Sequence, residues 1–246
     1  MVDISKIRTY KMKVAEVITE THDTKTIRFR FEQGQSLDYL PGQFVMLKTA
    51  VEHSGQTKNV ARAMSFASPS TRKEHFDLTV KETPGGALST HVVRKTKPGD
   101  EFEVKGPYGN FTFHDNSTDY IVLLGAGSGI TPLMCMIRHV ADKKLPVKTT
   151  LLYSNKTPGD IVYHKELLDL QGRHHNFHFV FTITRPEGYE WSGLTGRIDK
   201  NLLQEHLGNE KALYYICGPP VFVEDIVKML KELVVDSQRI KVEKYD

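Results

Sequence analysis

The chain has 246 residues, of which 39% are hydrophobic and 26% charged, and its formal net charge is +3. This length suggests one large domain or two modest ones, and the composition argues against a disordered, collagenous or coiled-coil protein. So small a net charge gives no indication of a nucleic-acid partner, and no apolar run reaches the roughly 18 residues of a membrane span. The two cysteines, Cys135 and Cys217, cannot form a disulfide framework, a zinc finger or a four-cysteine iron–sulfur cluster within the chain. We therefore expect a soluble protein of a reducing compartment, the cytoplasm.

Apolar and polar residues alternate along several segments before about residue 113. The clearest are 27–31, 76–80 and 102–104, and turn sequences with Gly, Pro or Asp separate them. A period of two is typical of half-buried antiparallel strands, and several such strands suggest a small barrel or sandwich. One short helix is expected over 87–94, after Gly85 and Gly86.

The pattern changes after the polar stretch 114–119. Residues 120–124 form a continuous apolar run, which is typical of a strand buried on both faces. Thr131 and Pro132 then predict a helix with Thr131 as its N-cap and proline at the first helical position. This order of strand and helix repeats to the end of the chain.

The later strands are expected at 148–153, 177–182, 213–217 and 240–244. Helices are expected to open at Thr157-Pro158, near 199–206 and after Pro219-Pro220. Such alternation predicts a five-stranded parallel sheet with helices on both faces. We therefore expect two domains, an antiparallel β-barrel over 1–114 and an α/β domain over 115–246.

The strongest local motif is the sequence GAGSGITP at 125–132, where the first parallel strand ends and its helix begins. Glycines there let the backbone approach a phosphate, and a helix N-terminus supplies free N–H groups. The alternative is a glycine-rich turn that only packs strand against helix. The third glycine comes two residues after the second instead of three, and the acidic ribose ligand expected about 20 residues on is missing. A classical dehydrogenase therefore fits poorly.

Two further motifs lie in the first half of the chain. In an extended strand Arg62, Met64 and Phe66 share one face, which suits a ligand with a phosphate and a flat ring. The alternative is a strand with an ordinary surface arginine. Gly85 and Gly86 precede the short helix and form a second possible phosphate cradle. Two cradles in two domains suggest two nucleotides.

Six motifs occur in the order expected of the ferredoxin–NADP reductase-like flavoprotein superfamily, and they lie at 62–65, 85–89, 106–109, 125–132, 217–220 and 242–245. The resemblance covers nearly the whole chain. It implies a Greek-key β-barrel that binds FAD, with FMN as the alternative, followed by a domain that binds NADPH or NADH. Hydride would pass to the flavin and electrons to a separate acceptor, which could be a ferredoxin-type carrier or other iron–sulfur protein, an oxygenase component, free flavin or ferric iron. The alternative is a non-catalytic nucleotide-binding or electron-transfer subunit of a larger complex.

The resemblance also implies roles for residues of the first domain. Arg62 matches the arginine on the flavin phosphate, and Met64, where the family usually has tyrosine, lies with Ser65 along the flavin ring. The other expected flavin-binding residues are Ala63, Leu78, Thr79, Val80, Gly85, Gly86, Ala87, Leu88 and Ser89.

In the second domain Cys217 resembles the cysteine beside the nicotinamide, and Ser65, Cys217 and Glu243 would surround the hydride path. Tyr245 resembles the aromatic residue that covers the flavin, although a docked chain end is the alternative. The residues expected to hold the nicotinamide and pyrophosphate are Gly127, Ser128, Gly129, Thr131, Pro132, Cys217, Gly218, Pro219 and Tyr245.

Ser154, Asn155 and Lys156 resemble the segment near the adenosine ribose. Lys156 and Arg185, with Arg197 as a further candidate, could meet a 2′-phosphate, which favours NADPH and leaves NADH open. We expect no metal site, because no cysteine or carboxylate cluster accompanies the histidines of the segment 174–178.

Overall fold

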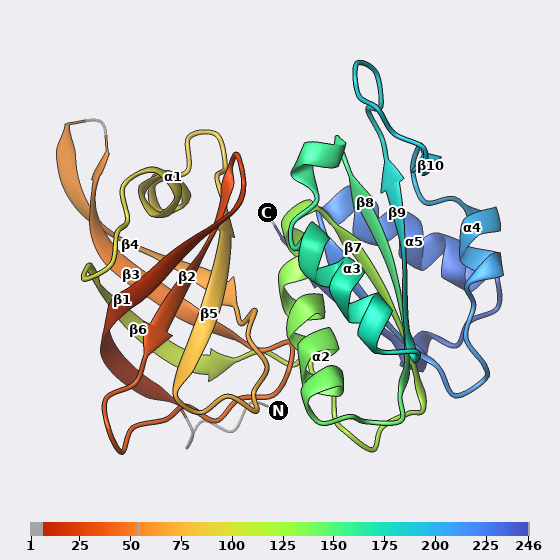
Figure 1. Cartoon of the computed structure of the whole chain (residues 1–246), viewed down its shortest axis with the longest axis horizontal. Coiled ribbons are helices and arrows are strands. Elements are labelled where there is room, and N and C mark those ends of the chain that lie inside the picture. Colours follow the sequence, from red (N-terminus) through yellow and green to blue (C-terminus); the bar gives the residue numbers. More distant parts are fainter. Residues whose placement is uncertain (1–6, 54, 246) are drawn as a thin grey trace. The chain divides into compact units, whose positions relative to one another are not determined.

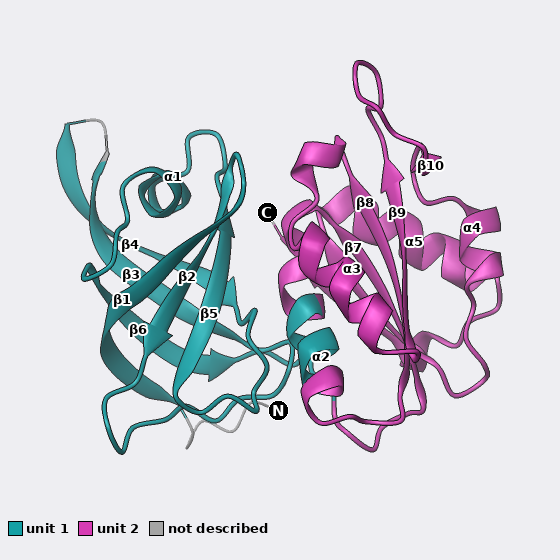
Figure 2. Ribbon diagram, in the orientation of Figure 1, with its two compact units in different colours: residues 1–113, 134–139 teal, residues 114–133, 140–246 magenta. Residues whose placement is uncertain are grey.

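A computed structural model describes residues 7–53 and 55–245, which fall into two compact units (Figure 2). Unit 1 comprises residues 1–113 with 134–139, and unit 2 comprises 114–133 with 140–246. Each unit is built on its own six-stranded sheet (Figure 1). Within the described part of the chain, no helix is both long enough and apolar enough to cross a membrane.

Unit 1 contains an antiparallel sheet in the order β4-β3-β6-β1-β2-β5. Its strands are β1 (Arg8–Thr21), β2 (Thr24–Arg30), β3 (Phe44–His53), β4 (Gln56–Ser65), β5 (His75–Lys81) and β6 (Glu101–Tyr108). An isolated bridge between Phe66 and Leu78 joins the end of β4 to β5, so the two outer strands of the sheet meet. This confirms the antiparallel barrel expected from the alternating segments.

The interior of unit 1 explains that alternation. Ile27 and Phe29 of β2 and Leu78 of β5 are fully buried, whereas Arg30 is exposed. Helix α1 spans Ala87–Arg94, as predicted. It buries Leu88, Val92 and Val93 and contacts strands β2 to β5.

Unit 2 contains a parallel sheet in the order β10-β9-β8-β7-β11-β12. Its strands are β7 (Tyr120–Ala126), β8 (Lys148–Asn155), β9 (Phe177–Ile183), β10 (Leu194–Thr195), β11 (Leu213–Gly218) and β12 (Ile240–Lys244). The sheet therefore has six strands and not the expected five. The additional strand, β10, is only two exposed residues long and is held by pairing with the end of β9, so it produces no hydrophobic pattern.

The helices of unit 2 differ from the predictions at two starts. A short 3-10 turn, η2 (Gly127–Gly129), leads directly into α2 (Ile130–Asp142), so Thr131 is not an N-cap. Its hydroxyl instead donates to the Ser128 carbonyl at 2.9 Å. After β8, Thr157-Pro158 opens the 3-10 turn η3 (Pro158–Asp160) through a capping box with Asp160, and α3 begins only at His164.

Two later helices, α4 (Lys200–Glu205) and α5 (Pro220–Glu232), follow the prediction. Helix α3 spans His164–Arg173, and the 3-10 turn η4 (Ser237–Arg239) was not predicted. The Asp199 side chain caps α4 by accepting the Leu202 N–H at 2.8 Å, and Pro219 with Pro220 opens α5. In a parallel sheet all strand ends of one kind share an edge, so the carboxyl ends of β7, β8 and β11 meet.

Candidate nucleotide sites

The glycine-rich turn lies at the carboxyl end of β7 in unit 2. Gly127 has a φ of +53°, in the region that favours glycine. A Cβ added to Gly129 would lie 2.2 Å from the carbonyl oxygen of Cys217, so only a glycine lets this turn pack against the end of β11. The first N–H groups of a helical turn have no acceptor within the helix, which makes this end of the sheet suited to a phosphate.

Tyr153, near the end of β8, supports the same turn from the neighbouring strand. Its side chain is fully buried and its hydroxyl donates to the Gly127 carbonyl at 2.9 Å. Burial raises the pKa of Tyr153, and a hydrogen bond with the Val162 backbone offsets part of the rise. The hydroxyl therefore remains a neutral hydrogen-bond donor at physiological pH.

Three of the four predicted catalytic residues come together in unit 2. The parallel register places Cys217 of β11 beside Gly125 of β7 and Glu243 of β12. Tyr245 follows β12, and its backbone N–H donates to the Gly218 carbonyl at 3.0 Å. The fourth residue, Ser65, belongs to unit 1, and its part in the group remains a prediction.

The surroundings of Cys217 determine its protonation state. Burial raises the pKa of this thiol well above its ordinary value, and the carboxylate of Glu243 raises it further because a second negative charge is unfavourable nearby. A hydrogen bond with the Tyr245 side chain offsets only part of the shift. Cys217 is therefore a neutral thiol at physiological pH, which suits a contact residue better than a covalent nucleophile.

The segments after β8 and β9 form the expected adenosine side of the site. The backbone N–H of Arg185 donates to the Lys156 carbonyl at 2.8 Å, so the two segments run together. Both side chains are exposed, and neither forms an ion pair with another described residue. Arg197, the further candidate, instead faces Asp225 at 3.7 Å.

Asn155, the last residue of β8, carries a buried amide that needs a partner. The residue is 3% exposed, and its backbone carbonyl accepts the Thr184 N–H at 2.9 Å. The amide is close enough to Tyr153 to lower the pKa of that hydroxyl. Neither polar atom of the Asn155 amide has a hydrogen bond of normal geometry within the described residues. A buried polar group without a partner is costly, so a polar ligand atom at this position would be favourable. Ser154, the preceding residue, is also buried.

The expected flavin face of unit 1 begins on β4. Arg62 is exposed, and its guanidinium donates to the neighbouring Ala61 carbonyl at 2.8 Å. Met64, two residues on, is half-buried against the core, and Phe66 is fully buried. This face therefore runs from a cation in solvent to an apolar interior. Of the other predicted residues on β4, Ala63 is exposed and Ser65 is buried.

Beyond the Phe66–Leu78 bridge, the strand that pairs with β5 among the described residues is β2, which lies along the opposite edge of β5. The edge of β5 toward Val80 is thus not covered by a β4 ladder, and backbone groups at such an edge can bind a flat polar ligand. Leu78 and Val80 are buried with Thr79, whose hydroxyl lies 2.6 Å from that of Thr26.

The second glycine pair precedes α1 in the same unit. Gly85 has a φ of +75°, and Gly86 occupies the N-cap without a side-chain capping bond. The Ser89 hydroxyl donates to the Gly86 carbonyl at 3.3 Å and accepts the Thr83 N–H at 3.1 Å, which fixes the turn. The first N–H groups of α1, at Ala87 and Leu88, are by position those that a helix leaves for an anion.

Comparison with known proteins identifies the family. Residues 11–113 match the oxidoreductase FAD-binding domain, and residues 123–228 match the oxidoreductase NAD-binding domain. The NADH-cytochrome b5 reductase 2 of Saccharomyces cerevisiae is 32% identical over 217 residues, which are 86% of this chain and 71% of that protein. This chain belongs to the ferredoxin–NADP reductase-like flavoprotein superfamily.

Other members of the ferredoxin–NADP reductase-like superfamily are similar over most of this chain. The glycine betaine monooxygenase reductase subunit of Chromohalobacter salexigens is 29% identical over 242 residues, and this chain spans 64% of its length. The FAD/NAD-binding domain of nitric oxide dioxygenase from Vibrio cholerae superposes with a TM-score of 0.85 at 24% identity and covers 96% of this chain and 98% of its own. A ferredoxin NADP+ reductase from Neisseria gonorrhoeae, solved with FAD and NADP, gives 0.78 at 22% identity, covering 96% and 98%. These two structures show the fold alone.

Membership in the ferredoxin–NADP reductase-like superfamily confirms the expected class and the order of the FAD-binding and NAD-binding domains. The residues present fit both groups. Arg62 and the turn at Gly85-Gly86 offer a cation and N–H donors to FAD, and the turn at 127–129 with the Asn155 amide offers donors to a dinucleotide. The roles of the individual residues remain predictions.

Tyr153 is a residue of the site that sequence reasoning missed, although it ends the strand expected over 148–153. The signal was available in part, because the paired parallel strands β7 and β8 place Tyr153 beside Gly125. What could not be read from the sequence is that the hydroxyl reaches two residues further, to the Gly127 carbonyl.

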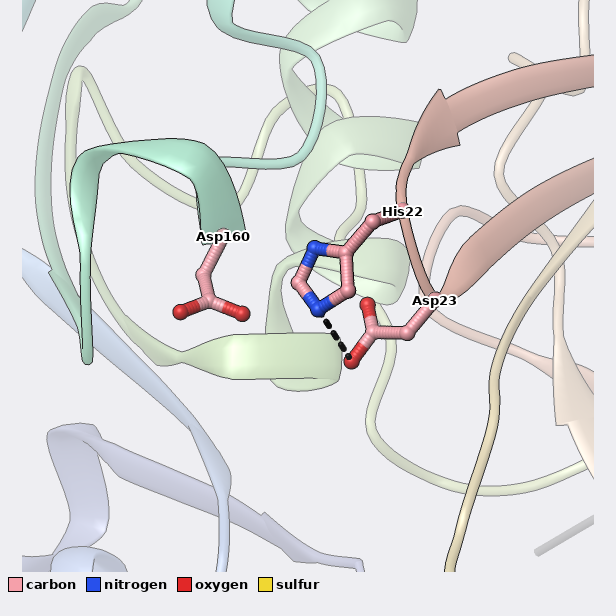
Figure 3. A group of neighbouring side chains, drawn as sticks. All are labelled: His22, Asp23 and Asp160. Carbon is pink, nitrogen blue, oxygen red and sulfur yellow. Dashed lines mark ion pairs between the residues drawn. The ribbon is translucent and has the colours of Figure 1, made fainter.

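His22, Asp23 and Asp160 are possible metal ligands outside these sites. Figure 3 draws His22, Asp23 and Asp160, with His22 Nε2 lying 3.7 Å from Asp23 Oδ2. Burial acts to raise the pKa of Asp23, but hydrogen bonds from Lys81 and neighbouring threonines outweigh it and leave the pKa below its usual value. Asp160 belongs to unit 2, where its carboxylate accepts from the Thr157 hydroxyl at 2.8 Å. We assign no metal site to these residues.

Proposed function

We propose that this chain takes a hydride from NAD(P)H onto a bound FAD and passes the electrons to a separate acceptor. The observation that supports this most is the assembly of Cys217, Glu243 and Tyr245 at the sheet edge that also carries the glycine turn. Bound flavin supplies the change between two-electron and one-electron transfer, which no side chain provides. The chain's own part is to bind and orient the two nucleotides.

The side chains near the turn suit that part. The neutral thiol of Cys217 offers a small, polarisable contact for an uncharged or cationic ring without adding a negative charge. Tyr245 offers an aromatic face, and its backbone is tied to Gly218. Glu243 places a carboxylate beside the thiol, where it can stabilise positive charge on an oxidised nicotinamide.

We further propose that NADPH is preferred over NADH. Lys156 and Arg185 are exposed cations at the end of β8 and after β9, and both are available to a 2′-phosphate. The first acidic side chain after β8, Asp160, is bound to Thr157 and so is not poised to accept a ribose hydroxyl. An acidic residue in that role is what NAD-specific sites commonly use.

For the acceptor we propose a protein with a one-electron centre, such as a ferredoxin-type carrier or an oxygenase component, ahead of free flavin or ferric iron. Relatives of this chain are named as a glycine betaine monooxygenase reductase subunit and as NADH-cytochrome b5 reductase 2, which supports a protein acceptor. Both cysteines are free and buried, which favours a reducing compartment such as the cytoplasm.

Oxidation of NADPH and NADH by the FAD-loaded protein tests this proposal, with ferricyanide, a ferredoxin, cytochrome b5, free flavin and ferric citrate as separate acceptors. The expected result is turnover with ferricyanide and with at least one protein acceptor, at a lower KM for NADPH than for NADH. Absence of turnover with every acceptor, ferricyanide included, would instead indicate a non-catalytic nucleotide-binding subunit.

A further inference from the structure

The hydroxyl of Tyr153 donates its hydrogen bond to the backbone of the glycine-rich turn at 127–129. It donates to the Gly127 carbonyl at 2.9 Å, and the same carbonyl accepts the N–H of Ile130 at the start of α2. A carbonyl oxygen has two acceptor positions, so this one is fully used. The contact of Tyr153 with Phe181 involves the ring and not the hydroxyl, and the ring centroids lie 6.1 Å apart. A phenylalanine at position 153 would make this contact equally well.

The next carbonyl along the turn is held in the same way. The oxygen of Ser128 accepts the Thr131 hydroxyl at 2.9 Å and also the N–H of Ile130. Two successive peptide groups, 127–128 and 128–129, therefore have their carbonyls tied to side chains of the protein.

Tying the carbonyls also orients the donors. In a trans peptide the C=O and N–H bonds point in opposite directions, and the one cis bond among the described residues is Gly106-Pro107, outside this turn. With the Gly127 carbonyl directed to Tyr153, the N–H of Ser128 points the other way. The N–H of Gly129 closes the 3-10 turn on the Ala126 carbonyl, whereas the Ser128 N–H has no acceptor within the turn. An N–H group left free at the start of a helical turn is suited to an anion.

We propose that Tyr153 is a positioning residue that presents the Ser128 N–H to the pyrophosphate of the nicotinamide nucleotide. This inference rests on the proposed function, because it requires the turn to bind NAD(P)H. The buried amide of Asn155, two residues further along the same face of β8, is a second polar group there with no partner of normal geometry within the described residues. Tyr153 itself touches the turn and not the ligand.

Tyr153→Phe removes the hydroxyl and leaves the ring. Tyr214→Phe is a matched control, since Tyr214 is equally buried in the same sheet but its hydroxyl accepts the Gly208 N–H at 3.1 Å, near the amino end of β11. Titration calorimetry with ADP-ribose, which contains the pyrophosphate and lacks the nicotinamide, measures the effect. Losing one net hydrogen bond predicts a dissociation constant about fivefold higher for Tyr153→Phe and an unchanged one for Tyr214→Phe.

Steady-state kinetics of the FAD-loaded variants add a second readout. KM for NADPH should rise with the dissociation constant, while kcat at saturation and flavin content stay at the wild-type values. An equal loss of affinity in both variants, or a fall in kcat without a rise in KM, would mean that Tyr153 acts only as a core residue and would overturn the inference.

The wild-type protein separates this inference from the function on which it rests. If the wild type binds ADP-ribose and Tyr153→Phe binds it equally well, the inference fails and the proposed function stands. If the wild type binds neither ADP-ribose nor NADPH, both fail. Should Tyr153→Phe not fold, amide NMR of the wild type decides: the Ser128 N–H resonance must shift on addition of ADP-ribose, and an unshifted resonance would refute the proposal.

Discussion

Gly129 packs where the β7–α2 turn meets the end of β11. Replacing it with alanine adds one carbon whose nearest neighbours are all backbone atoms: the Cys217 oxygen at 2.2 Å, the Cys217 carbonyl carbon at 2.5 Å and the Gly218 Cα at 2.8 Å. None of these atoms can rotate away as a side chain would. The turn and the strand must therefore separate by roughly 1 Å to restore ordinary contact distances.

The cost follows from the rigidity of both partners. Adding a methyl group to a well-packed site typically costs about 1–3 kcal/mol, and the backbone neighbours place Gly129→Ala near the upper end, at about 3 kcal/mol of unfolding free energy. Because Cys217 moves with the strand, affinity for NADPH should fall about tenfold or more. Urea unfolding followed by circular dichroism measures the first effect, and fluorescence titration with NADPH measures the second.

Gly172→Ala is the matched control for this substitution. Gly172 lies in α3, and a Cβ there would meet no atom within 4 Å. Alanine should leave nucleotide affinity unchanged and raise the unfolding free energy by about 0.5–1 kcal/mol, since glycine is the poorer helix former. If Gly129→Ala matched the wild type in both stability and NADPH affinity, the packing of the turn against β11 described above would be refuted.

Three further predictions concern single side chains. Arg62→Ala should raise the dissociation constant for FAD about tenfold at unchanged stability, measured by fluorescence titration of the apoprotein, and equal affinity would remove Arg62 from the flavin site. Lys156→Ala should raise KM for NADPH several-fold and leave KM for NADH unaltered, and a parallel rise in both would argue against a 2′-phosphate contact. Burial raises the pKa of Cys135 from 9.0 to about 12, so the unfolded chain ionises this thiol first and stability falls as pH rises above about 9. Between pH 8 and 10 the free energy of unfolding should drop by about 1.4 kcal/mol more in the wild type than in Cys135→Ala, and identical pH slopes in the two proteins would contradict this.

The fold could be predicted largely because burial sets the sequence period. Ile27 and Phe29 alternate with polar residues since only one face of β2 is covered, and 120–124 is uniformly apolar since β7 is covered on both faces. Strand β10 could not be predicted, because its two exposed residues show no hydrophobic period and are ordered by pairing with β9.

Local chemistry explains the errors at the helix starts. Thr131 has the residue type of an N-cap, but the glycines before it already turn the chain, and its hydroxyl donates backward to Ser128. The capping box at Thr157 opens only a 3-10 turn of three residues. Tyr163, in a left-handed conformation, lies between that turn and the start of α3.

Motif order and strand register predict part of the candidate site, but not the hydrogen bonds within it. Cys217 and Glu243 were expected to meet, and parallel pairing of β11 with β12 brings them side by side. Tyr153 depends on a hydrogen bond between a strand end and a turn, and residue spacing does not encode such a bond. Ser65 lies in the other unit, so its approach to the nicotinamide site remains a prediction.

The visible spectrum of the purified, FAD-reconstituted protein, recorded anaerobically before and after addition of NADPH, tests the proposed function most directly. The account predicts a flavin absorption band that NADPH bleaches and air restores, with NADH acting at higher concentration. A protein that takes up no flavin, or whose flavin band neither nucleotide bleaches, would contradict it.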